Sequence, residues 1–180
     1  MFEHDFTLIG KHATYTKFLA KERRETDERE KPYIFQRYID VYMTAAVIGL
    51  LHGCRGVRDT TSTDRGRIYA DAFATERIQC EFIYRLVMLL DESTGLSLEQ
   101  RIDRAFRTDS QKDEEKQKSN MELFNSYVLG GIEILYGIFS AGIANKDDFI
   151  DKAYEFVANF KEEIQGISND RIMEALSSYK

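Results

Sequence analysis

The sequence predicts an all-α fold: a single-domain helical bundle of about six or seven helices, two of them long and central. Three observations lead to this prediction. The 180 residues include one proline, they are 43 % hydrophobic and 31 % charged, and apolar residues recur at helical spacing through most of the chain. A chain of this length can bury one sizeable core, so residues 1–180 are expected to form one domain.

Residues 1–31 are expected to form an N-terminal helix and a charged connection. Residues 6–10, FTLIG, favour a short extended piece, and a helix begins at about Lys11, where apolar residues take up helical spacing. The run KERRETDEREK at 21–31 alternates in charge, which is typical of a solvated helix face or a flexible connection. Pro32 ends this run at a position that suits the first turn of the next helix.

Residues 33–92 are expected to form a helix–loop–helix core. The stretch YIFQRYIDVYMTAAVIGLLHG, 33–53, is apolar on most sides, which is typical of a helix that neighbours bury on several faces. After a loop, the stretch 68–92 places its apolar residues on or beside one stripe and predicts the second long helix.

Residues 97–180 supply the remaining helices. Ser97 and Gln100 have the spacing of a capping box, which starts a short helix. Ser110 and Asp113 repeat that signal before a longer helix.

The core part of that longer helix, 123–144, is rich in glycine, which costs an exposed helix about 1 kcal/mol per residue relative to alanine. We expect close backbone approach to the helix at 33–53 to compensate, and a ligand pocket is the alternative. Asn145 starts a further amphipathic helix, and 168–180 predict a last short one.

Composition and charge narrow the function. The net charge of −6 means that the whole molecule repels polyanions, so any contact with nucleic acid requires a local basic patch. Cys54 and Cys80 lack the number and spacing of a metal site or a secreted disulfide framework, and the N-terminus lacks the pattern of a signal peptide. The apolar stretches are short or interrupted, as by Glu133, so no membrane span is expected. We therefore expect a cytoplasmic protein with no metal and no cofactor.

The arginines are distributed unevenly. From residue 32 to residue 111 every basic residue is an arginine, and the segment HGCRGVRDTTSTDRGR, 52–67, contains four of them: Arg55, Arg58, Arg65 and Arg67. The planar arginine side chain binds phosphate or carboxylate bidentately, and the neighbouring Ser and Thr hydroxyls can donate to phosphate oxygens. One interpretation is a contact with a nucleic-acid backbone. The other is a flexible loop whose arginines pair with the acidic half of the chain or with a neighbouring subunit. The spacing matches no P-loop.

A second set of arginines, Arg101, Arg104 and Arg107, recurs at i, i+3 and i+6 in RIDRAFR. They are candidates for contact with phosphate or with a partner protein. A solvated helix face that makes local ion pairs is the ordinary alternative.

Charged residues on the buried helix at 33–53 are costly unless they are paired. Arg37 and Asp40 are therefore expected to find partners within the fold, the candidates being Glu76, Glu81, Arg77, Arg85 and Glu133. An alternative interpretation is a small helical enzyme or ligand-binding regulator. Its pocket would lie between the helices at 33–53 and 123–144 and would be lined by Arg37, Asp40, Glu133 and Tyr136.

No pattern in the sequence requires catalysis. His52 and Cys54 supply an imidazole and a thiol, but residues two apart on a helix do not face each other. We assign no catalytic residue and favour a non-catalytic protein.

The segments GKHATYTKFLAKE, IFQRYIDVYMTAAVIGLLHGCRG, FIYRLVMLLDE and LEQRIDRAFR carry a resemblance. They resemble small helical accessory proteins encoded beside bacterial DNA-phosphorothioation (Dnd-type) defence and restriction genes. The resemblance covers roughly residues 8–140 and includes no catalytic motif. It implies a bacterial accessory protein that works with a larger protein of a DNA-modification or defence complex, and with DNA. An acidic bundle with an arginine-rich edge is also compatible with a homo-oligomer.

Overall fold

The computed structural model describes residues 2–21, 33–107, 114–142 and 146–177. They form seven helices and one two-stranded sheet, so the predicted mostly helical fold is confirmed. The chain divides into two compact units. The first ends at Gly137, and the second contains the C-terminal part of the chain from Ile138 onward. The charged connection after Lys21, Pro32 and the signal at Ser110 and Asp113 lie outside the described residues.

The small sheet joins two distant parts of the first unit. Strand β1 (Phe6–Ile9) pairs antiparallel with β2 (Arg65–Ile68), with Phe6 opposite Ile68 and Ile9 opposite Arg65. The extended piece predicted at 6–10 is therefore confirmed, and α1 (Lys11–Leu19) begins where it was expected. Strand β2 was not predicted, because a four-residue strand with two arginines and a glycine lacks the apolar alternation that marks a strand in sequence.

The two predicted central helices differ from expectation in length and continuity. Helix α2 (Tyr38–Leu51) begins five residues later than predicted, because the amides of Ile34 and Phe35 donate to the Leu19 carbonyl at the end of α1. The helix predicted at 68–92 is wrong as one element: it is divided at Glu76 into α3 (Ala70–Thr75) and α4 (Arg77–Leu90).

Of the later helices, α5 (Leu98–Phe106) begins at its predicted start signal, while the signal at Asn145 lies outside the described residues. Helix α5 begins with a full capping box made by Ser97 and Gln100, as predicted. Helix α6 (Glu114–Ser140) and helix α7 (Lys146–Ser177) are the longest of the described helices, at 27 and 32 residues. The separate last helix predicted at 168–180 is wrong, because α7 runs on past Gly166, an isolated glycine of a kind that helices tolerate.

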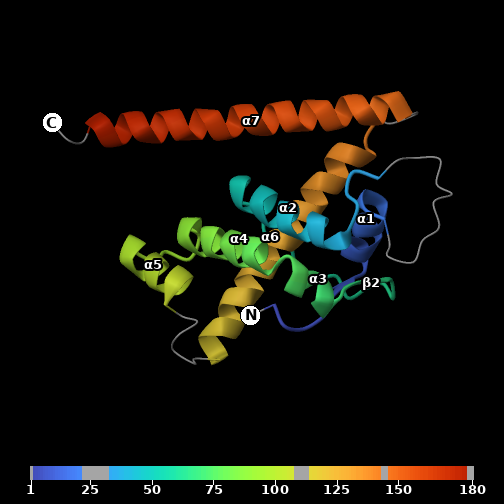
Figure 1. Ribbon diagram of the computed structural model, residues 1–180, viewed down its shortest axis with the longest axis horizontal. Helices are drawn as coiled ribbons and strands as arrows, with labels where there is room; N and C mark the ends of the chain where they lie inside the picture. Colours follow the sequence, from blue (N-terminus) through green and yellow to red (C-terminus); the bar gives the residue numbers. More distant parts are fainter. Residues whose placement is uncertain (1, 22–32, 108–113, 143–145, 178–180) are drawn as a thin grey trace. The chain divides into compact units, whose positions relative to one another are not determined.

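Aromatic side chains form the centre of the first unit. The ring of Tyr42 on α2 lies 5.3 Å from Phe73 of α3 and 5.7 Å from Phe124 of α6, and Tyr84 of α4 lies 5.6 Å from Phe124. All four side chains are fully buried or nearly so. The bend at Glu76 lets α3 and α4 contribute to the same cluster, while α6 runs obliquely across α2 and α4 (Figure 1).

Glycines bring α6 and α2 into backbone contact. A Cβ at Gly131 of α6 would lie 1.9 Å from the carbonyl oxygen of Ala45, and one at Gly49 of α2 would lie 2.1 Å from that of Tyr127. The expectation that the glycines permit close helix packing is confirmed. Among the described helices, α6 also has the length and hydropathy of a membrane span. Of its most apolar 18-residue stretch, 44 % is buried in the fold.

Gly131→Ala tests this contact. The added methyl group has no space, so we expect a loss of about 1–3 kcal/mol in unfolding free energy, as for other overpacked cores. Gly137→Ala on the same helix is the control, because nothing lies within 4 Å of its Cβ position, and we expect it to gain about 0.5–1 kcal/mol from helix propensity. Urea unfolding followed by circular dichroism at a helical wavelength measures both. Equal stabilities for the two variants would contradict the packing.

Candidate functional site

Hydrogen bonds attach the arginine segment, 52–67, to the rest of the fold at several points. The Gly56 amide donates to the Ser126 carbonyl of α6 (2.7 Å), and the Gly10 amide donates to the Asp64 carbonyl (3.0 Å) before the chain enters β2. A Cβ at Gly56 would lie 2.7 Å from the Gly130 amide nitrogen, so the two backbones touch. Backbone hydrogen bonds therefore define the path of this segment at Gly56 and at Asp64.

Two carboxylates of the segment bind α1. Asp59 accepts from the amide of Lys11 (2.7 Å) at the start of the helix, where a negative charge is favourable. Hydrogen bonds from the Thr61 hydroxyl and from the Lys11 and Thr61 amides lower the pKa of Asp59 to about 2. Asp64 accepts from Thr14 (2.8 Å) and pairs with Lys17, and the Lys17 bond is the main cause that lowers its pKa. The segment's acidic side chains thus serve to attach it to α1.

The four arginines of the segment remain exposed. Arg55 donates to the Ser93 hydroxyl (3.2 Å), Arg65 donates to backbone carbonyls, and Arg58 has no hydrogen bond or ion pair to any described residue. Arg67 lies 3.7 Å from Asp5, which is a long contact between two half-exposed side chains. None of the four therefore makes a close ion pair with a carboxylate in the part of the chain that the structure describes.

The expected alternation of β2 directs two of these side chains outward. Arg65 and Arg67 are exposed, whereas Gly66 and Ile68 between and beside them are buried. Successive strand residues point to opposite faces, so Arg65 and Arg67 share one face of the sheet.

Most arginines on the described parts of the helices differ, because a carboxylate lies within 3.1 Å of each; the exception is Arg85, which lies 3.9 Å from Glu81. Those of α4 pair with Glu81, and Arg37 at the start of α2 pairs with Asp40 (2.6 Å) and Glu76 (2.7 Å). The expectation that Arg37 and Asp40 find partners inside the fold is confirmed. The second candidate set also pairs: Arg101 with Glu92, Arg104 with Asp91, and Arg107 with Asp103.

Arg104 is not a surface residue. Its side chain is 8 % exposed and donates to the Met88 carbonyl (2.6 Å), the Thr94 hydroxyl (3.1 Å) and the Asp91 carboxylate (3.1 Å). Helix α5 instead exposes an apolar stripe of Leu98, Ile102 and Phe106. The interpretation of Arg101, Arg104 and Arg107 as one contact surface is therefore wrong, because α5 faces the fold with its polar side.

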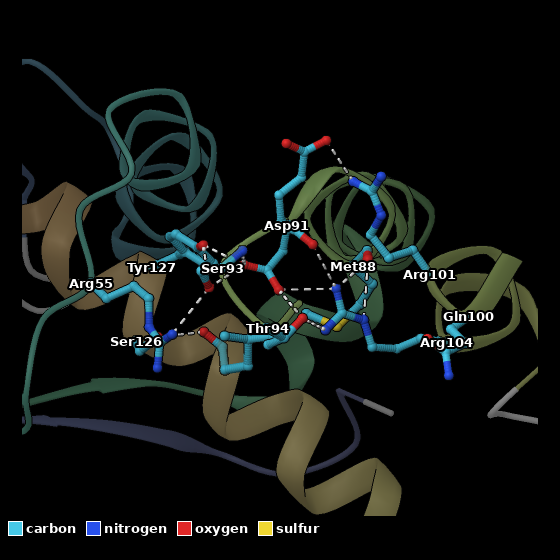
Figure 2. A network of polar contacts seen from close by, with 12 residues as sticks. Arg55, Met88, Asp91, Ser93, Thr94, Gln100, Arg101, Arg104, Ser126 and Tyr127 are labelled. Atoms are coloured by element: carbon cyan, nitrogen blue, oxygen red, sulfur yellow. Dashed lines mark hydrogen bonds and ion pairs between the residues drawn. The ribbon is translucent and has the colours of Figure 1, made fainter. Parts of the chain in front are cut away.

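Asp91 is the centre of a buried polar cluster that joins α4, α5 and α6 (Figure 2). Its carboxylate accepts from the Tyr127 hydroxyl (2.6 Å), the Ser93 hydroxyl (2.6 Å) and the Thr94 hydroxyl (2.9 Å), besides Arg104. Burial by itself would raise the pKa of Asp91, but the hydrogen bonds from Ser93, Tyr127, Thr94 and Arg104 outweigh it and lower the pKa to about 2. The carboxylate is therefore ionised and satisfied at neutral pH, which is a structural role.

The pocket predicted between α2 and α6 does not form from the four residues proposed for it. Glu133 lies against α1, where its carboxylate is 2.9 Å from the His12 ring and 3.1 Å from Lys11. The Tyr136 ring stacks on Tyr15 of α1, with centroids 3.8 Å apart. Arg37 and Asp40 lie at the start of α2 and pair there. The prediction is wrong because backbone contact at the glycines fills the space between the two helices.

A different pocket, of about 270 Å³, lies where α2, β2 and α3 meet. Arg37 and Arg67 line it together with Tyr38, Tyr69 and Asp71. It brings together two residues that the sequence assigned to separate sites.

Sequence reasoning missed Asp91 and Tyr69. Asp91 follows the last residue of α4, where a negative charge opposes the helix dipole, and this unfavourable position was a signal that a cation lies nearby. Tyr69 belongs to the apolar stripe expected for the helix at 68–92, whereas it precedes α3 and is 37 % exposed. The described residues contain no group of three or more His, Cys, Asp or Glu side chains placed to hold a metal ion.

A comparison of the chain with protein-family models, with curated proteins and with solved structures finds no match.

Arg104→Ala tests the buried cluster. Removing one partner of a buried ion pair leaves the other charge uncompensated, so we expect a loss of about 3–5 kcal/mol in unfolding free energy. Arg107→Ala is the control on the same helix, because its ion pair with Asp103 is half-exposed and such pairs contribute less than about 1 kcal/mol. Urea unfolding distinguishes them. Similar losses for both variants would contradict a structural role for the buried pair.

The pKa of Asp91 predicts how stability depends on pH. Because folding lowers this pKa from 3.8 to about 2, the ionised carboxylate stabilises the fold above about pH 4, and this contribution of about 2 kcal/mol is lost as the pH falls through 2. Asp91→Asn should be less stable at neutral pH and should lose less stability between pH 4 and pH 2. An acid dependence equal to that of the unsubstituted protein would show that Asp91 does not hold the low pKa.

Proposed function

We propose that this protein is a cytoplasmic, non-catalytic helical module that binds DNA through its arginine segment, as an accessory part of a bacterial DNA-modification or defence complex. The observation that carries the DNA contact is the difference between two groups of arginines. Arg37, Arg77, Arg101, Arg104 and Arg107 each have a carboxylate partner within 3.1 Å, whereas Arg55, Arg58, Arg65 and Arg67 have none closer than 3.7 Å in the described structure.

The form of the segment supports this proposal. Its backbone is held by α1, α6 and β1, so the arginines are presented without the cost of ordering a flexible loop upon binding. The hydroxyl residues at 60–63 are exposed beside them; the Thr61 hydroxyl donates to Asp59, and those of Thr60, Ser62 and Thr63 can donate to phosphate oxygens. The remainder of the chain is acidic and repels DNA, which favours an approach by this segment.

The cellular setting is supported by the resemblance of the helical segments to Dnd-type accessory proteins. An accessory role also fits the small number of cationic contacts, because four arginines neutralise few phosphates and leave room for a larger partner protein to supply further affinity.

Duplex DNA binding at low and moderate salt tests the contact. We expect Arg55→Ala/Arg58→Ala/Arg65→Ala/Arg67→Ala to weaken binding and to reduce the slope of log K against log salt by about 3 to 4, since each phosphate contact contributes about 0.9. Fluorescence anisotropy with a labelled duplex measures both quantities.

The matched control removes the same charge from four arginines outside the segment, on or beside α4 and α5: Arg77→Ala/Arg85→Ala/Arg101→Ala/Arg107→Ala. It should retain most of the affinity and the salt slope. Equal losses in the two variants would show that net charge, and not the segment, governs binding, and would overturn the proposal. Equally tight binding of poly-glutamate would instead indicate an acidic protein partner.

A further inference from the structure

We propose that the pocket where α2, β2 and α3 meet binds a nucleobase, either the unstacked base of a DNA strand that lies on the arginine segment or the base of a free nucleotide. This inference extends the proposed function and rests on it for the first of these two sources.

The walls suit a flat ring. Tyr38 and Ile39 from the start of α2 meet Ile68 at the end of β2, Tyr69 beyond it, and Ala72 on α3. The volume of about 270 Å³ is near the lower limit of about 300–1,000 Å³ for small-molecule sites. A base fits this size class, and aromatic walls stack on bases of every sequence.

The polar groups of the rim match the edge of a base. Gln36, Asp71 and Thr75 line the pocket: the Gln36 amide carries donors and an acceptor, Asp71 carries a carboxylate, and the Thr75 hydroxyl, which donates to the Asp71 carbonyl (2.9 Å), can still accept. A base presents donors and acceptors side by side along one edge, so a rim of mixed character is complementary to it.

Charge balance argues against a bare anion. Lys21, Arg37 and Arg67 line the pocket, but Asp71 lines it too. Arg37 is already bound by the carboxylates of Asp40 and Glu76, which raise its pKa. Inorganic phosphate would therefore gain little from entering, whereas a neutral ring is not repelled.

The pocket continues directly into the arginine segment. The Arg67 guanidinium lies 5.9 Å from the centre of the Tyr69 ring, and Arg65 is exposed on the same face of β2. A strand whose phosphates contact Arg65 and Arg67 would place a base next to Tyr69. Binding of single strands commonly combines a cationic track with an aromatic platform in this way.

Binding of three probes tests the inference: deoxyadenosine monophosphate, inorganic phosphate, and a short single-stranded oligodeoxyadenosine. We expect saturable binding of the nucleotide and the oligonucleotide but not of phosphate, and Tyr69→Ala should weaken both by about tenfold or more. Tyr69→Phe keeps the ring and should bind as the unsubstituted protein does. Tyr154→Ala removes an exposed tyrosine of α7 and is the control. NMR titration measures nucleotide binding, and fluorescence anisotropy measures oligonucleotide binding.

The outcomes separate this inference from the proposed function. If the nucleotide binds in a Tyr69-dependent manner but no DNA binds, the pocket stands with a free nucleotide as its ligand, and the proposed function fails. If duplex binding depends on the four arginines but Tyr69→Ala leaves nucleotide and single-strand binding unchanged, the pocket inference alone is overturned. Absence of nucleotide and single-strand binding, or equal binding of inorganic phosphate, also overturns it.

Discussion

At Gly131 and Gly49 the backbones of α6 and α2 lie so close that no Cβ fits between them. This contact also determines the path of the chain that follows α2. A Cβ at the neighbouring Gly130 would lie 2.2 Å from the carbonyl oxygen of Cys54. The residues that follow α2 therefore also pack against the glycine-rich part of α6. The first residues of the arginine segment therefore follow a path set by helix packing. The glycines lower helix propensity and are compensated by dense contact, which explains why α6 stays helical through them.

The second feature that determines how the helices pack is the polar side of α5, which carries Arg104. A buried ion pair often adds little net stability compared with apolar residues of the same size, because both charges lose their hydration. Arg104 and Asp91 therefore have their clearest effect on geometry, because the Met88 carbonyl and the hydroxyls of Ser93, Thr94 and Tyr127 must align with them, which fixes α5 against α4 and α6. Because the polar side of α5 faces the fold, its apolar side chains Leu98 and Phe106 are exposed to solvent, which is unfavourable.

Local signals in the sequence predicted most of the helices, because capping at Ser97 and apolar periodicity act over a few residues. They also predicted the role of the glycines and the pairing of Arg37. The burial of Arg104 could not be predicted, since it depends on Asp91 across a turn and on Tyr127 from a distant helix. The division at Glu76 and strand β2 likewise depend on tertiary partners. The pocket at Tyr69 was missed for the same reason: its walls come from three elements that only the fold brings together.

The pairing of β1 with β2 has a consequence for the order of folding. Phe6–Ile9 can pair with Arg65–Ile68 only after the intervening chain has closed a long loop, and contacts of such sequence separation form slowly compared with helices. Arg65 and Arg67 acquire their common orientation at that step. A nascent or partly folded chain would thus carry the same four positive charges without their arrangement, so the proposed DNA-binding surface would be complete only after β1 and β2 have paired.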